Sequence, residues 1–257
     1  MTSPEWGSLL KRLADDELIL PAFENQMLSE KWPDSYQVTI DSGPYYGAGD
    51  GYFHPSTHPL MGARELYYRF HPDTRDLIQR ERRSMQSLMT MTMGSSLHAV
   101  LQTQFQMAGL IASPDDIEVE YVNRDHHVRG RLDMIVDHPN GDRIPVEIKT
   151  INSFSFKNQL KSGIKQSWDA QVSLALDELG FDRGVLLMVE AGWPYQMREF
   201  IVPRNDALLN QVYTKFDLVR EAIKNNTPPE YCCSFDSTEM KKCDARFSCW
   251  LEDEEKV

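Results

Sequence analysis

Two apolar runs joined by an Asn-Gly turn place the strongest constraint on the fold of this chain. Residues 129–138 read RGRLDMIVDH and residues 142–151 read DRIPVEIKTI, both rich in branched apolar side chains. Asn140-Gly141 lies between them, and this dipeptide is typical of tight β-hairpin turns. A further β-rich run, DIEVEYVN, precedes them at 116–123. The sequence therefore predicts a three-stranded meander near the centre of the chain.

Helical patterns flank this meander. Apolar residues recur at three-to-four spacing through 76–109, where Gly94 is expected to mark a break between two helices. A single helix is predicted from about Asn158 to Leu179. The predicted elements that follow are strands at 183–192 and 195–203 and a helix at 205–225. The core order is therefore helix, three strands, helix, strand.

Polar residues within the apolar strands share one face. Side chains alternate along a strand, so Glu147 and Lys149 point one way while Val146 and Ile148 point the other. The hairpin brings Asp133 laterally close to Glu147. Converging carboxylates bind a hard divalent cation such as Mg²⁺. A lysine beside them can position a water, so this set of residues suits phosphodiester hydrolysis.

A structural role is the alternative for the same residues. Glu147 and Lys149 would then form a solvated strand face, and Asp133 would pair with Arg131 or Arg143. Surface ion pairs of this kind are common and contribute little to stability. Spacing alone does not decide between the two interpretations.

Four short motifs in a fixed order add to the case for a functional site. MGSSLHAVL contains G-x-x-x-H with His98, GRLD ends at Asp133, VEIKT contains Glu147 and Lys149, and WDAQVSLAL contains Gln171. Together they resemble the motifs of the PD-(D/E)xK nuclease superfamily, specifically its RecB-like branch, over most of the chain. The resemblance implies an α/β fold with a restriction-endonuclease-like core, in which helices flank a mixed central sheet.

The resemblance also implies roles for individual residues. His98, Asp133 and Glu147 would hold the metal ion, with the backbone carbonyl of Ile148 as a further ligand. Imidazole together with carboxylates suits Mn²⁺ as well as Mg²⁺. Lys149 would be the catalytic lysine and would act together with Asp133 and Glu147.

Gln171 would help to bind and orient the substrate, although Ala175 stands where the family carries the tyrosine of Q-x-x-x-Y. The implied function is that of a metal-dependent DNA exonuclease, a phosphodiester hydrolase acting in recombination, repair or replication. A structure- or site-directed endonuclease and a catalytically silent DNA-binding module of the same fold are the alternatives. The presence of every residue type of the metal site favours catalysis.

The cysteines cluster near the end of the chain and suggest a second metal site or cluster. They are Cys232, Cys233, Cys243 and Cys249. The tail is similar to that of CRISPR-associated adaptation nucleases and of the AddB nuclease, which hold an iron–sulfur cluster with one early and three late cysteines. Cys243 and Cys249 match two of those positions, but Ala63 and Met240 occupy the other two. An iron–sulfur cluster or Zn²⁺ stays an alternative, and the missing ligands favour a tail without metal.

A basic and aromatic segment follows the predicted catalytic lysine. No acidic residue occurs in 148–168, and Lys157, Lys161 and Lys165 recur every four positions, which predicts one face of one helix. Phe154, Phe156 and Trp168 are interleaved with them. Lysines that meet phosphates and rings that stack on bases suit single-stranded DNA ends. The alternative is a solvated helix face with core aromatics, and the weaker basic run RERR at 80–83 is a second candidate surface.

Composition limits the partners and the location. The net charge is 27 − 39 = −12, which argues against bulk attraction to nucleic acid but allows a local basic groove. No apolar run is long enough to cross a bilayer, and the first residues lack the features of a signal peptide, so a cytoplasmic protein is expected. Beyond DNA, recombination or replication proteins are expected partners, and related ring-forming exonucleases suggest a homo-oligomer.

The predicted domain organisation has three consecutive segments. Residues 1–83 form an N-terminal extension that is loop-rich and then helical, residues 84–225 form the nuclease core, and residues 226–257 form the cysteine-containing tail.

Overall fold

The computed structural model of the 257-residue chain describes residues 17–29, 32–40, 50–78 and 84–251. The chain folds into two compact units, each built from separate stretches. The first comprises Met1–Ser42, Met89–Tyr121 and Arg131–Arg204, and the second comprises Gly43–Leu88, Val122–Gly130 and Asn205–Val257. Each unit combines residues from more than one of the three consecutive segments expected from the sequence. The predicted division into an extension, a nuclease core and a tail stays a prediction.

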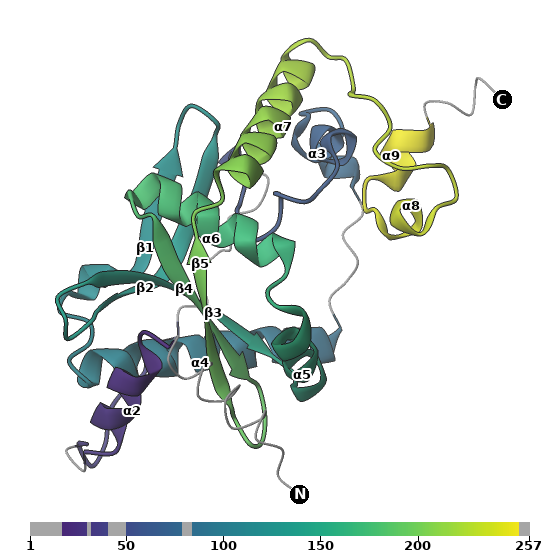
Figure 1. Ribbon diagram of the computed structural model, residues 1–257. Coiled ribbons are helices and arrows are strands. Elements are labelled where there is room, and N and C mark those ends of the chain that lie inside the picture. Colours follow the sequence, from purple (N-terminus) through teal and green to yellow (C-terminus); the bar gives the residue numbers. More distant parts are fainter. Residues whose placement is uncertain (1–16, 30–31, 41–49, 79–83, 252–257) are drawn as a thin grey trace, which may run out of the picture. The chain divides into compact units, whose positions relative to one another are not determined.

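A five-stranded mixed sheet forms the framework of the fold (Figure 1). Its strands lie in the order β1-β2-β3-β4-β5. β2 pairs antiparallel with β3, β3 parallel with β4, and β4 antiparallel with β5. The parallel pair is possible because a helical crossover connects β3 to β4. The strand bounds are β1 Ile117–Asn123, β2 Val128–Asp137, β3 Arg143–Ile151, β4 Arg183–Glu190 and β5 Met197–Pro203.

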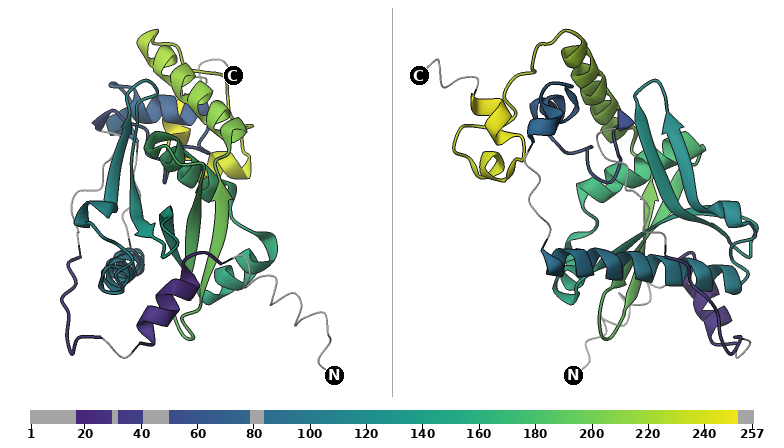
Figure 2. Two further views of the ribbon diagram at one scale, coloured as in Figure 1. Left: turned by 60° about the vertical axis from the view of Figure 1, so that its left-hand side comes forward. Right: turned by 180° about the vertical axis from the view of Figure 1, so that it is seen from behind.

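Helices cover the sheet on both faces. On one face, α2 (Leu20–Met27) and α4 (Met85–Met107) share an apolar cluster with β2, β3 and β4. On the other, α5 (Ser153–Ser162) and α6 (Gln166–Leu179) share a second cluster with β4 and β5 (Figure 2). The sheet therefore has the fold class predicted from the sequence, a mixed α/β core flanked by helices.

The expected break at Gly94 is wrong, because α4 runs through it without interruption. A Cβ atom at Gly94 would lie 3.3 Å from the Oγ1 atom of Thr150 on β3. The glycine therefore permits a close approach between helix and strand, rather than ending a helix.

The single helix expected from Asn158 to Leu179 is also wrong. α5 ends at Ser162, its C-cap Gly163 has φ 77°, and α6 begins at Gln166. A glycine with positive φ is a common helix terminator. Consequently Lys157 and Lys161 lie on α5 while Lys165 is the N-cap of α6, so the three lysines do not share one helix face.

The second compact unit is mainly helical. It contains α3 (Ala63–Phe70), α7 (Asp206–Lys224), α8 (Thr238–Lys242) and α9 (Arg246–Leu251). Two short 3₁₀ turns, Arg75–Leu77 and Pro114–Asp116, complete the described helical elements of the chain. The basic run 80–83 lies outside the described residues. Within the described part of the chain, no helix is both long and apolar enough to span a bilayer.

Candidate active site

Asp133 on β2 lies beside β3, as the hairpin predicted. The paired residues Met134 and Val146 fix the register, and the Asp133 Oδ2 atom accepts a hydrogen bond from the backbone N–H of Ile148 at 2.6 Å. Its other oxygen, Oδ1, lies 3.3 Å from the Nδ1 atom of His98 on α4. The structure therefore brings together three of the predicted site residues from a helix and two strands.

The alternative ion pairs for Asp133 are not formed. The Nε atom of Arg131 lies 3.0 Å from Glu118, and Arg143 pairs with Asp116 and Asp137. The Asp133 carboxylate therefore contacts His98 and the backbone N–H of Ile148 on β3.

Glu147, Lys149 and Gln171 form a closed triangle of hydrogen bonds on the face of the sheet that α6 covers. The Lys149 Nζ atom donates to Glu147 Oε1 at 2.8 Å and to Gln171 Oε1 at 2.7 Å. The Gln171 Nε2 atom donates to the same Glu147 oxygen at 2.6 Å. Glu147 and Gln171 are buried and Lys149 is half-buried. Gln171 therefore holds both charged groups in place, although Ala175 replaces the tyrosine of its motif.

The electrostatics of the two carboxylates differ. Burial, and then repulsion from Asp133, raises the pKa of Glu147 to about 7. Burial alone would raise the pKa of Asp133 too, but His98, Lys149 and the Ile148 N–H together hold it below its ordinary value. Burial lowers the pKa of His98, and Asp133 overcomes this and raises it. A raised pKa means that the protein environment disfavours ionised Glu147, so a cation bound beside its carboxylate would lower that pKa again.

Two further residues belong to this site and were missed in the sequence. The Gln102 Nε2 atom donates to the backbone carbonyl of Asp133 at 2.8 Å and to Glu118 Oε1 at 2.9 Å. Gln102 lies four residues after His98 on α4, so helical spacing could have revealed that they share a face. Glu118 has φ 53°, and nothing in its sequence context indicates this backbone conformation.

The predicted metal ligands have suitable chemistry. Carboxylate oxygens with an imidazole suit Mg²⁺ or Mn²⁺, and among the described residues no hydrogen bond uses the Oε2 atom of Glu147. Within the described ranges, however, no three His, Cys, Asp or Glu side chains are grouped closely enough to hold a metal ion as they stand. Metal binding by His98, Asp133, Glu147 and the carbonyl of Ile148 stays a prediction.

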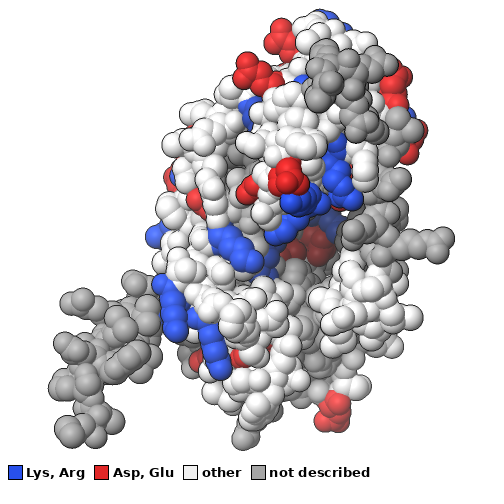
Figure 3. All heavy atoms as spheres, turned by 90° about the vertical axis from the view of Figure 1, so that its right-hand side faces the viewer, with Lys and Arg blue, Asp and Glu red and all other residues white. Residues whose placement is uncertain are grey.

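The basic segment after β3 is only partly arranged as predicted. Lys157 and Lys161 are exposed on α5, and Figure 3 shows basic side chains on the side of the molecule where α5 lies in Figure 1. Phe154 is 76% exposed. Phe156 is buried in the core, and Lys165 lies over the ring of Trp168 at 4.7 Å. Phe156 therefore cannot act as a stacking platform.

The cysteine tail lies in the second unit. All four cysteines are free, and Cys249 is buried and accepts a hydrogen bond from Arg64 Nε at 3.2 Å. Burial raises the pKa of Cys243 to about 12 and that of Cys249 above its ordinary value, which favours neutral thiols. A Cβ atom at Gly62 would lie 2.4 Å from the Cys232 sulfur. A tail without metal stays the prediction, with an iron–sulfur cluster or Zn²⁺ as the alternatives.

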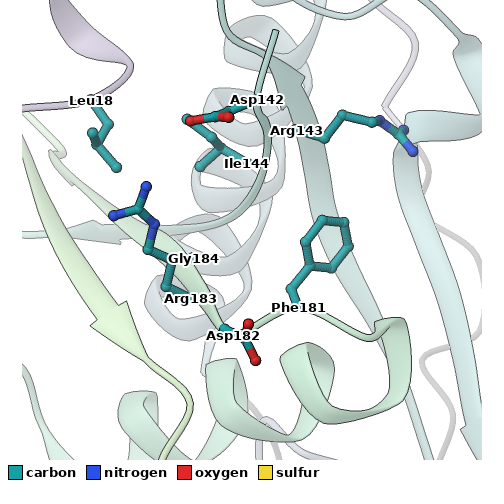
Figure 4. Close-up of a pocket in the computed structure, with 8 residues that line it drawn as sticks. All are labelled: Leu18, Asp142, Arg143, Ile144, Phe181, Asp182, Arg183 and Gly184. Carbon is teal, nitrogen blue, oxygen red and sulfur yellow. The ribbon is translucent and has the colours of Figure 1, made fainter. Parts of the chain in front are cut away.

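A pocket of about 240 Å³ lies elsewhere in the first unit. Its lining includes Arg143 and Ile144 at the start of β3, and Arg183 and Gly184 at the start of β4 (Figure 4). None of the predicted site residues lines it.

Comparison with known proteins extends the result for the fold. The sequence matches no family model and no curated protein. The alkaline exonuclease LHK-Exo of Laribacter hongkongensis, in its complex with dAMP, has a TM-score of 0.51 at 16% identity, covering 70% of this chain and 91% of the other. The chain therefore shares the mixed α/β fold of this exonuclease, which is the fold class expected from the sequence. At this identity the likeness shows the fold alone, and the RecB-like branch stays a prediction.

Two further structures are similar to a lesser degree. LHK-Exo without the nucleotide gives a TM-score of 0.48 at 16% identity, covering 68% of this chain and 89% of the other. A protein crystallised as SSO0001 gives 0.46 at 17% identity, covering 95% of both chains.

Proposed function

We propose that this protein is a metal-dependent DNA exonuclease that hydrolyses phosphodiester bonds at the site of His98, Asp133, Glu147, Lys149 and Gln171. The observation that carries the proposal is the hydrogen-bonded triangle of Lys149, Glu147 and Gln171 beside Asp133. A lysine ammonium fixed between a buried carboxylate and a buried amide, next to a second carboxylate, suits catalysis better than a solvated strand face. The similar fold of LHK-Exo, an exonuclease, supports the proposal.

The side chains of this chain would divide the work of hydrolysis. His98, Asp133, Glu147 and the carbonyl of Ile148 would hold Mg²⁺ or Mn²⁺, which when bound offsets charge that develops on the phosphoryl oxygens. Lys149 donates a hydrogen bond that orients the attacking water toward phosphorus. The water oxygen forms the new P–O bond and releases one proton to solvent, the ester P–O bond breaks, and the leaving oxygen takes up one proton from solvent.

Positioning of Lys149 is the proposed contribution with the strongest support from hydrogen bonds. Its ammonium has two acceptors at 2.8 and 2.7 Å, which leaves one of its three N–H groups for the water or the phosphate. Gln171 fixes the lysine and Glu147 at once, so neither side chain has to be ordered when DNA binds.

DNA is the proposed substrate because basic side chains follow the site closely in the sequence and lie on the helix after β3. Lys157 and Lys161 project from the helix that directly follows β3, and 148–168 holds no acidic residue. LHK-Exo was crystallised with dAMP, a deoxynucleotide, which agrees with this choice. The proposal includes a place in DNA recombination, repair or replication, in the cytoplasm, with proteins of those processes as partners and with a homo-oligomer as the assembly.

Hydrolysis of end-labelled linear DNA with Mg²⁺ or Mn²⁺ tests the proposal. Activity should disappear with a chelator and return when the ion is added back. Asp133→Asn should need a higher ion concentration, because one carboxylate charge is lost. Hydrolysis that persists unchanged in the chelator would refute the metal-dependent mechanism.

The form of the DNA separates the exonuclease from its alternatives. An exonuclease degrades linear DNA and leaves covalently closed circles intact, whereas an endonuclease cuts both. Binding without hydrolysis under all these conditions would identify a catalytically silent DNA-binding module.

A further inference from the structure

Two aromatic side chains stand exposed at the tip of the hairpin between β4 and β5. Trp193 is 85% exposed and Tyr195 is 58% exposed. Single exposed apolar residues are normal on a protein surface, but large aromatic rings grouped on one short turn are characteristic of binding surfaces. Nothing in the site described above uses them.

The hairpin tip lies at the end of the sheet where α5 begins. Ile151, the last residue of β3, pairs with Glu190, the last residue of β4, and the Ala191 N–H donates to the Ile151 carbonyl at 2.7 Å. α5 starts two residues after Ile151. Figures 1 and 2 show the hairpin and α5 side by side at this end of the sheet.

The catalytic lysine lies on the strand that leads to this end. Lys149 precedes Ile151 by two residues, a distance of about 7 Å along an extended strand. A polymeric ligand bound at the hairpin and α5 would therefore need only a short further length to reach the site.

The charge next to the exposed rings is positive. Lys157 and Lys161 are exposed one turn apart on α5, and neither forms an ion pair with any of the described residues. Phe154 is exposed on the same helix, whereas Glu190 at the base of the hairpin is buried. The surface thus combines free ammonium groups with aromatic faces.

We propose that Trp193, Tyr195, Phe154, Lys157 and Lys161 form a surface that binds single-stranded DNA and leads its end to the site. The inference rests on the proposed function and specifies its substrate as a single-stranded or frayed end. Phosphates complement the two lysines, and unpaired bases stack on the exposed rings. A duplex offers the same phosphates, but its base faces are stacked and out of reach, so the rings favour the single strand.

Binding of a fluorescein-labelled oligothymidylate, followed by anisotropy in the Lys149→Ala protein with chelator present, tests the surface apart from catalysis. Trp193→Ala should weaken binding about tenfold, in the range expected for one lost stacking contact. Phe247→Ala, which removes a half-exposed ring in the second unit, should leave the affinity unchanged. Unchanged thermal unfolding of Trp193→Ala shows that the fold is intact.

Salt dependence tests the lysines. Each phosphate contact on a single strand contributes about 0.7 to the slope of log K against log salt, so Lys157→Ala with Lys161→Ala should reduce that slope by about 1.4. The paired control, Lys224→Ala with Lys242→Ala, should leave it unchanged. Equal slopes in both double variants would overturn the role of α5.

Hydrolysis rates distinguish failure of this inference from failure of the proposed function. With Mn²⁺, the protein should degrade single strands faster than blunt duplexes, and Trp193→Ala should remove that preference. Suppose that the protein degrades DNA but that Trp193→Ala binds and cleaves single strands as well as Phe247→Ala does. The proposed DNA-binding surface would then be refuted, while the proposed nuclease activity would remain supported. Loss of dimerisation in Trp193→Ala, with unchanged affinity for DNA, would also refute the DNA-binding surface. It would show instead that the hairpin tip binds a second copy of the protein.

Discussion

Replacement of Gln171 by methionine tests how the site is held together. Gln171 is buried and makes two hydrogen bonds with the charged groups of Lys149 and Glu147, at 2.7 and 2.6 Å. A hydrogen bond to a charged group contributes about 1.5–3 kcal/mol. Methionine has a similar volume and makes neither bond, so packing changes little while both groups lose a partner.

The expected loss is smaller than the sum of the two bonds. Lys149 and Glu147 keep their own contact at 2.8 Å, and Lys149 is partly open to water. We therefore expect about 2 kcal/mol of lost transition-state stabilisation, which lowers kcat/KM for linear DNA about 30-fold. Most of the loss should fall on kcat, because Gln171 acts chiefly by positioning the Lys149 ammonium.

The matched control is Gln106→Met, an exposed position on α4. Its kcat/KM should stay within twofold of the parent protein. A Gln171→Met protein with the same kcat/KM as this control would refute the positioning role of Gln171, whatever its effect on thermal stability.

Two further predictions concern stability. Gly184→Ala should lower the free energy of unfolding by about 1–3 kcal/mol in thermal denaturation, because its Cβ would lie 2.8 Å from the Pro145 carbonyl oxygen; an unchanged midpoint would contradict the close approach. Burial lowers the pKa of His58 from 6.5 to about 3, so below pH 6.5 the unfolded chain binds a proton that the folded chain does not. Stability should fall by up to about 1.4 kcal/mol per pH unit from pH 6.5 toward 3, and His58→Gln should reduce this slope; an identical slope would refute it.

The strands and the centre of the site could be predicted from the sequence because they depend on local patterns. Alternation along 143–151 places Glu147 and Lys149 on one face, and the Asn140-Gly141 turn sets the pairing that brings Asp133 to β3. His98 was found from its motif and lies beside Asp133. The first two features follow from the alternation of side chains along a strand and from the turn, whereas the choice of His98 rests on the resemblance to the nuclease motifs.

Features that depend on contacts between distant segments could not be predicted in this way. Gly94 was expected to break a helix, but its role is close packing against Thr150, which is far away in the sequence. The backbone conformation of Glu118 and the bridge that Gln102 makes to it arise only when α4 meets the sheet. Gly163 divides the predicted helix because it has positive φ, which glycine adopts without strain but does not always adopt.

The initial rate of nucleotide release from end-labelled linear DNA, with Mg²⁺ or Mn²⁺, tests the central claim most directly. Lys149→Ala removes the ammonium that Glu147 and Gln171 hold. Lys224→Ala removes an exposed lysine from the last turn of α7. The rate should fall to background in Lys149→Ala and remain at the parent level in Lys224→Ala. Equal rates in the two variants would contradict the assignment of this site.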